Sequence, residues 1–180
     1  HFVKRGKMMK NLEREELLKF QDFFNGIYEL SENYYKKFIA LGYEAELRHS
    51  INNGFYVGNE YKVSKYFLPE IEFKGTSSIV FFEKGICFYY WSIPKKNLKE
   101  YHLNYINNRV EHGKLEIFGS EDYMKDFYFG DPKETILNIE MSTEKEFQVA
   151  VTLRYDLLEE IEMEKHIETF VDIYNKIFTA

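Results

Sequence analysis

The sequence predicts an α+β protein in which an antiparallel sheet of about six strands packs against an N-terminal, a middle and a long C-terminal helix. Two segments, 11–41 and 157–178, carry apolar residues at the three- and four-residue spacing of amphipathic helices. Between them lie apolar runs of strand length, separated by Asn-Gly, Glu-Lys-Gly and Pro turns. Helices kept apart from runs of hairpin-connected strands are typical of the α+β class.

The composition predicts a folded protein without a membrane segment. The 180 residues are 44% hydrophobic and 18% aromatic, which excludes a disordered chain and allows one core over residues 11–180. No apolar run approaches the ~18 residues of a spanning helix, and no apolar segment follows the basic start as in a signal peptide. Cys87 is the single cysteine, so no internal disulfide is available. These features together predict a cytoplasmic protein without membrane partners.

Charge is distributed unevenly along the chain. Residues 1–10 have four basic and no acidic groups, which predicts a disordered or tag-like basic leader: Lys4, Arg5, Lys7 and Lys10. The other 170 residues have 20 basic and 30 acidic groups, within a net charge of −6 for the whole chain. Such an acidic body repels phosphate backbones, so the sequence predicts no nucleic-acid partner and favours an acidic surface or a basic protein partner.

The N-terminal helix is predicted over residues 11–41. Its apolar positions follow one another at three- and four-residue spacing, Asn11 is a suitable N-cap, and Gly42 can close its C-terminal end. Ser31 could start a new helix, so one long helix and two shorter ones both fit.

The first strands are predicted at residues 43–52 and 55–67, around Asn53-Gly54, a dipeptide typical of a type I′ hairpin turn. A short edge strand follows at residues 70–74. Glu70 and Glu72 share one of its faces, and we interpret them as charges that discourage edge-to-edge aggregation rather than as an acid–base pair.

Residues 77–94, SSIVFFEKGICFYYWSIP, predict a hairpin that is apolar on both faces. A three-residue loop with Gly85 in the left-handed conformation pairs Phe82 with Ile86 and Val80 with Phe88 on one face. The other face then carries Ile79, Phe81, Cys87, Tyr89 and Trp91. A half-exposed strand would alternate apolar with polar residues. This hairpin is therefore either covered on both sides, or covered on one side with an exposed apolar face on the other.

The remaining elements complete the α+β order. A helix is predicted over 97–110 with Asn97 as its cap, and a strand over 114–118. Residues 134–141 and 146–155 predict a second hairpin around Ser142-Thr143-Glu144. The C-terminal helix is predicted over 157–178, with Asp156 as its cap and an apolar stripe that makes it integral to the fold.

No residue set predicts catalysis, a metal or a cofactor. The five histidines are not spaced as zinc ligands, and the least unsuitable candidate is His112 beside Glu111 and Glu116. Cys87 lies in a strand among aromatic residues, where a thiol is usually an inert small hydrophobe. The glutamates of the C-terminal helix are interpreted as its solvated side.

Two segments resemble a known group of proteins. LNYINNRVEHGKLEIF, residues 103–118, and the last strand and helix, residues 147–178, resemble the small bacterial proteins of the YbjN group and the type III secretion chaperone-like fold. The extra early strand and the segment 119–132 depart from that pattern. The resemblance implies proteins that bind other proteins, often as dimers, and that have no catalytic residues to carry over.

The predicted function is that of a non-enzymatic protein-binding module, a chaperone, regulator or immunity-type inhibitor, and a homodimer. The predicted contact residues combine large apolar area with polar tips, as protein interfaces do: Tyr56, Ile79, Phe81, Tyr89 and Trp91. An alternative is a START-like protein that encloses a small apolar ligand between a curved sheet and the C-terminal helix. A third possibility is an enzyme with scattered catalytic residues.

Overall fold

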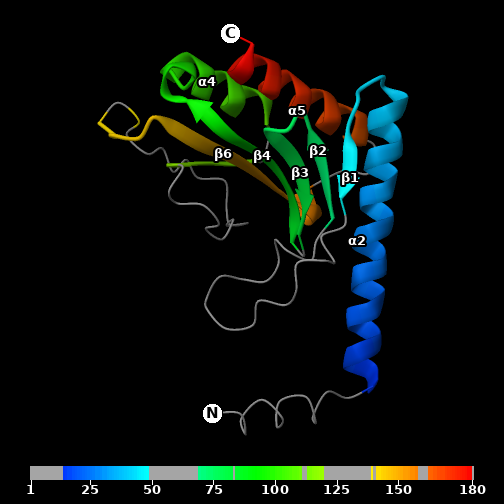
Figure 1. Cartoon of the computed structure of the whole chain (residues 1–180). Helices are drawn as coiled ribbons and strands as arrows, with labels where there is room; N and C mark the ends of the chain where they lie inside the picture. Colours follow the sequence, from blue (N-terminus) through cyan, green and yellow to red (C-terminus); the bar gives the residue numbers. More distant parts are fainter. Residues whose placement is uncertain are drawn as a thin grey trace, which may run out of the picture.

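The computed structural model describes residues 14–48, 69–82, 84–110, 113–119, 139, 141–157 and 162–179. These residues form one antiparallel sheet of six strands, in the order β1-β2-β3-β4-β6-β5, with three α-helices (Figure 1). The predicted α+β class is therefore confirmed. The strands are β1 (Glu46–Arg48), β2 (Glu70–Phe73), β3 (Ser77–Phe81), β4 (Gly85–Pro94), β5 (Lys114–Gly119) and β6 (Glu146–Arg154). The helices are α2 (Arg14–Ala40), α4 (Glu100–Arg109) and α5 (Met163–Phe178), with short 3-10 turns η3 (Lys95–Asn97) and η5 (Tyr155–Leu157).

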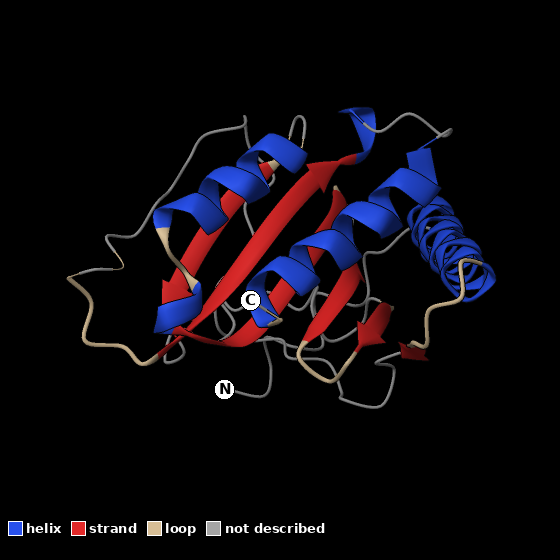
Figure 2. Cartoon of the chain, turned by 90° about the horizontal axis from the view of Figure 1, so that it is seen from above, coloured by secondary structure: helices blue, strands red, loops and turns tan. Residues whose placement is uncertain are grey.

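The helices and the sheet form two layers. Helices α4 and α5 lie side by side across one face of the sheet, and α2 passes the edge formed by β1 (Figures 1 and 2). The C-terminal part of α2 packs against α5, where Lys37 and Glu164 form an ion pair at 2.5 Å. No described helix is both long and apolar enough to cross a membrane.

Phe170 of α5 lies at the centre of the core between the two layers. Its ring centroid is 5.3–6.1 Å from four other aromatic rings, those of Phe38, Phe73, Phe88 and Tyr90, and we call this group the Phe170 cluster. The Tyr90 hydroxyl donates a hydrogen bond to the Phe170 carbonyl at 2.9 Å, which satisfies the polar end of a fully buried ring.

The two long helices differ from their predictions in different ways. Helix α2 is a single helix, and Gly42, with a φ of 87°, ends it as predicted. Helix α5 begins at Met163, so the predicted start at residue 157 is wrong. Asp156 lies in the 3-10 turn η5 instead, where its carboxylate accepts a hydrogen bond from the Arg154 guanidinium. The prediction that Asn97 caps α4 is also wrong. Its side chain donates a hydrogen bond to the Ile177 carbonyl at 2.8 Å, and Lys99 is the N-cap of α4.

The observed strand order contradicts two predictions about which strands are neighbours. Strand β2 is not an edge strand, since it lies between β1 and β3, and Arg48 of β1 forms an ion pair with Glu72. Strand β6 has β4 on one side and β5 on the other, so the segment 134–141 is not its hairpin partner. Most of that segment, like the predicted strand 55–67 with Tyr56, lies outside the described residues.

The predicted register of the β3–β4 hairpin is wrong by one residue. Ile79 lies opposite Phe88 and Val80 opposite Cys87, because Phe82 donates its N–H to the Gly85 carbonyl across only two residues. Gly85 is not left-handed either. A Cβ there would lie 1.9 Å from the Leu153 carbonyl oxygen, so this glycine allows β6 to approach closely.

Candidate functional site

The sheet face directed away from α4 and α5, here called the outer sheet face, mixes aromatic and polar side chains. The register places Cys87 and Tyr89 of β4 opposite Thr152 and Ala150 of β6. The residues of the outer sheet face on β3, β4, β6 and β5 are Ser78, Val80, Cys87, Tyr89, Trp91, Gln148, Ala150, Thr152, Lys114, Glu116 and Phe118. This face therefore differs in chemistry from the helix-facing side, where the Phe170 cluster lies.

The predicted contact residues are divided between the two faces. Ile79 and Phe81 are fully buried beneath the helices, and the Phe81 ring meets the Tyr34 ring edge-on at 5.3 Å. Tyr89 and Trp91 lie on the outer sheet face, where Tyr89 is buried and Trp91 is half-buried. The prediction that all four share one face is wrong, because the one-residue shift in register moves Ile79 and Phe81 to the other side. Their role in binding stays a prediction.

Trp91 occupies a β-bulge, which we call the Trp91 bulge. The pairing of β4 with β6 shifts between Tyr90 and Ile93, and Ser92 has a φ of 54°, in the left-handed region that non-glycine residues rarely adopt. The Trp91 N–H still donates to the Thr76 carbonyl at 3.0 Å. Trp91 is half-buried, whereas the strand residues before it, from Gly85 to Tyr90, are all buried. The bulge thus sets Trp91 apart from the core of its own strand.

A hydrogen-bonded row fixes the ring on which Trp91 rests. The Trp91 and Tyr89 ring centroids are 5.4 Å apart, and the Tyr89 hydroxyl donates to the Gln148 side-chain oxygen. The Gln148 amide in turn donates to the Gly119 carbonyl at 3.3 Å. Because Tyr89 and Gln148 are almost completely buried, these bonds fix the orientation of the tyrosine ring against which the tryptophan packs.

A charged pair lies further along the same face, on β5. Lys114 and Glu116 form an ion pair at 3.1 Å, and their side chains are only 9% and 16% exposed. Charges this well buried are retained when they are paired. The only sign of this pair in the sequence is its i, i+2 spacing within a predicted strand, which places both side chains on one face.

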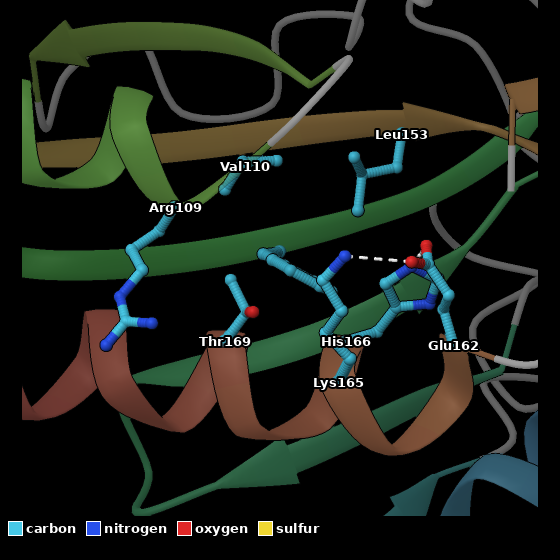
Figure 3. A pocket seen from close by; sticks show the side chains of 8 residues that line it. Arg109, Val110, Leu153, Glu162, Lys165, His166 and Thr169 are labelled. Atoms are coloured by element: carbon cyan, nitrogen blue, oxygen red, sulfur yellow. Dashed lines mark hydrogen bonds and ion pairs between the residues drawn. The ribbon is translucent and has the colours of Figure 1, made fainter.

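A second candidate site is a small cavity beneath α5, here called the His166 cavity (Figure 3). Four lining residues come from one side of α5 and its N-cap Glu162, where positions three, four and seven apart face the same way. The cavity has a volume of about 30 Å³ and is lined by Phe88, Arg109, Val110, Leu153, Glu162, Lys165, His166 and Thr169.

His166 connects two helices through its ring nitrogens. The Tyr34 hydroxyl of α2 lies 2.9 Å from Nδ1, and a Glu162 carboxylate oxygen lies 3.7 Å from Nε2. With the Nε2 proton directed to Glu162, Nδ1 accepts the hydrogen bond that Tyr34 donates. Burial lowers the pKa of His166 and raises the pKa of Tyr34, so both groups are neutral at pH 7. The negative charge of Glu162 opposes this lowering of the His166 pKa, and the positive charge of Lys165 adds to it.

The size of the His166 cavity limits its chemistry. About 30 Å³ holds one or two water molecules, whereas sites for organic ligands measure about 300–1,000 Å³. Across the described residues, no group of three or more histidine, cysteine, aspartate or glutamate side chains could hold a metal ion. The Tyr34–His166–Glu162 chain therefore serves best as a polar connection between α2 and α5. Sequence reasoning missed it, because its members lie up to 132 residues apart.

This connection predicts a pH-dependent stability. Since the folded pKa of His166 lies below its ordinary value of 6.5, the unfolded chain binds more protons just below pH 6.5. The free energy of unfolding should therefore fall as the pH drops below about 6.5, until the folded pKa is reached. Denaturant titrations at about pH 7.5 and pH 5.5 should show a smaller decrease for His166→Gln than for the unsubstituted chain. His102, whose pKa burial also lowers, contributes in the same direction, so the His102→Gln/His166→Gln pair should show the smallest decrease. An unchanged pH dependence in His166→Gln would contradict the proton linkage.

Comparisons with known proteins concern the fold. Residues 16–169 match the family model described as "Protein of unknown function (DUF3201)". A solved structure, "Conserved hypothetical protein Pfu-178653-001" from Pyrococcus furiosus, superimposes with a TM-score of 0.62 and 21% identity. The match covers 89% of this chain and 98% of that one. A search of curated proteins found no match. The resemblance to YbjN and type III secretion chaperones stays a prediction.

Proposed function

The chain belongs to the family described as "Protein of unknown function (DUF3201)", and from its geometry we propose that it is a non-enzymatic binding protein that contacts a protein partner at the Trp91 bulge. The observation that carries the proposal is the exposure of Trp91. It is the single tryptophan of the chain, and it is half-buried, whereas residues 85–90 before it in β4 are all buried.

The local backbone supports a contact role. A bulge re-aims the side chain next to it, and a left-handed non-glycine residue such as Ser92 carries a conformational cost that surrounding structure must offset. Such features concentrate at functional sites. A tryptophan held against an immobilised tyrosine loses little further conformational entropy on binding, which is a property of the residues that dominate interface energetics.

The His166 cavity itself supports neither of the two alternatives. A START-like ligand needs roughly ten times the volume of this cavity. An enzyme using His166 as a base would need substrate within hydrogen-bond reach of a free ring nitrogen. In this structure both ring nitrogens already face partners, Tyr34 and Glu162.

A pair of substitutions on β4 tests the surface role of Trp91. Phe88→Ala should lower the free energy of unfolding by about 3–5 kcal/mol, because Phe88 is fully buried in the Phe170 cluster. Trp91→Ala should lower it by only about 1–2 kcal/mol, since Trp91 is less buried than Phe88 and lies outside the Phe170 cluster. Chemical denaturation monitored by circular dichroism measures both. Equal losses would place Trp91 in the core and remove the basis of the proposal.

A further inference from the structure

The surface of α4, on the opposite side of the molecule from the Trp91 bulge, combines exposed aromatic rings with cations. Its members, here called the α4 surface, are Lys99, Tyr101, Tyr105 and Arg109 of α4 and its cap, and Lys176 of α5. Helices α4 and α5 lie side by side, and the start of α4 is next to the end of α5 (Figure 2). Tyr101 is 53% exposed, the largest exposure of any described aromatic residue.

Two of the three cations of the α4 surface, Lys176 and Arg109, lie over its aromatic rings. The Lys176 Nζ lies 5.6 Å from the Tyr101 ring centroid and 5.2 Å from that of Tyr105. The Arg109 guanidinium lies 5.4 Å from the Tyr105 centroid, donates to its hydroxyl and pairs with Asp172 at 3.1 Å. Cations positioned over aromatic faces need less ordering when they meet an anion than free side chains do.

The segment that contains α4 is basic within an acidic protein, and the acidic group of α5 beside it, Asp172, is paired with Arg109. Residues 95–109 contain four basic groups, Lys95, Lys96, Lys99 and Arg109, against Glu100 alone, whereas the chain has a net charge of −6. His102 lies among them, and its pKa is lowered by burial and then by Lys176 and Lys99. The lowered pKa is consistent with a locally positive potential.

We propose that the α4 surface binds an acidic segment of a partner protein. Its carboxylates would pair with Lys99, Lys176 and Arg109, and its apolar atoms would cover the exposed ring of Tyr101. The ten residues of α4 span about 15 Å, which matches four to five residues of an extended peptide at about 3.3 Å each.

The observations favour a peptide over single-stranded nucleic acid. Base stacking needs open ring faces, and Lys176 and Arg109 already approach the rings of Tyr101 and Tyr105. The net charge of −6 also repels nucleic acid, and this repulsion grows with the number of phosphates. A peptide segment with only a few carboxylates is repelled less.

Fluorescence anisotropy with two labelled probes tests the proposal. One probe is a short peptide of alternating aspartate and glutamate with one central tyrosine, and the other is an oligothymidylate of equal charge. Variant Lys99→Glu/Lys176→Glu reverses two cations of the α4 surface. Its matched control, Lys19→Glu/Lys36→Glu, makes the same change in net charge at exposed positions of α2. Tyr101→Ala removes the exposed ring without disturbing the core.

The expected result is saturable binding of the peptide that weakens about tenfold or more in Lys99→Glu/Lys176→Glu and several-fold in Tyr101→Ala. The α2 control should stay within about twofold of the unsubstituted chain. Absence of peptide binding, an equal loss in the α2 control, or tighter binding of the oligothymidylate would each overturn the proposal. Because Trp91 lies on the other face of the sheet, Trp91→Ala should leave peptide binding unchanged, so this proposal and the proposed function can fail separately.

Discussion

Replacing Phe170 with alanine should lower the free energy of unfolding by about 3–5 kcal/mol. Phe170 is fully buried, and its ring contacts rings from α2, β2 and β4 at once. The substitution therefore leaves a cavity bordered by several elements that cannot all close around it. Because small domains are stable by only about 5–15 kcal/mol, this single change removes a large share of the total.

Guanidinium denaturation of the Phe170→Ala chain measures this loss. The control is Phe23→Ala, the same chemical change at a residue of α2 that is 38% exposed, and it should cost less than about 1 kcal/mol. If Phe170→Ala does not fold, Phe170→Leu, which keeps most of the volume, should fold with a smaller loss. Equal losses at positions 170 and 23 would show that the Phe170 cluster is not the centre of the core.

Removing residues 157–180 should give an insoluble or molten chain. Helix α5 supplies six buried residues to the space between the layers: His166, Ile167, Phe170, Val171, Ile173 and Ile177. Burial of each large apolar side chain contributes about 1.5–3 kcal/mol, so the helix contributes on the order of the stability of a whole domain. The truncated chain also exposes the helix-facing side of the sheet, including Phe88 and Tyr90.

Solubility, near-ultraviolet circular dichroism and binding of a hydrophobic dye measure the outcome of this deletion. A matched truncation that removes only residues 179 and 180, beyond the end of α5, should remain folded. A soluble product of 1–156 that unfolds cooperatively would contradict an integral role for α5 and would make it a docking arm.

The class of the fold was predictable because it depends on periodicity, which each segment carries in itself. The apolar stripe of α2 and the apolar runs of strand length on each side of Gly85 specify element type without reference to the rest of the chain. Neighbours in the sheet were less predictable. Strand β6 pairs with β4 and β5, which are distant in sequence, and local turn signals do not encode such pairing.

The face on which each hairpin residue lies depended on a single residue of loop length. The hydrogen bond from Phe82 to Gly85 shortens the turn, and every side chain on β3 then changes its partner on β4. Tyr89 and Trp91 could be proposed as contact residues because aromatic residues with polar tips are visible in the sequence. The Tyr34–His166 contact and the bulge at Ser92 were missed because tertiary packing creates them.

Site-specific photo-crosslinking from residue 91 tests the central claim, that the Trp91 bulge contacts a protein partner, most directly. The chain would carry a benzophenone amino acid in place of Trp91 and be illuminated in cells of its own host. A second chain would carry the same group in place of Lys36, an exposed residue of α2. The account predicts a protein adduct of defined mass from position 91, identified by mass spectrometry as one partner or a second copy of the chain, that is absent from position 36. The absence of any protein adduct at position 91, or the same set of adducts from both positions, would contradict it.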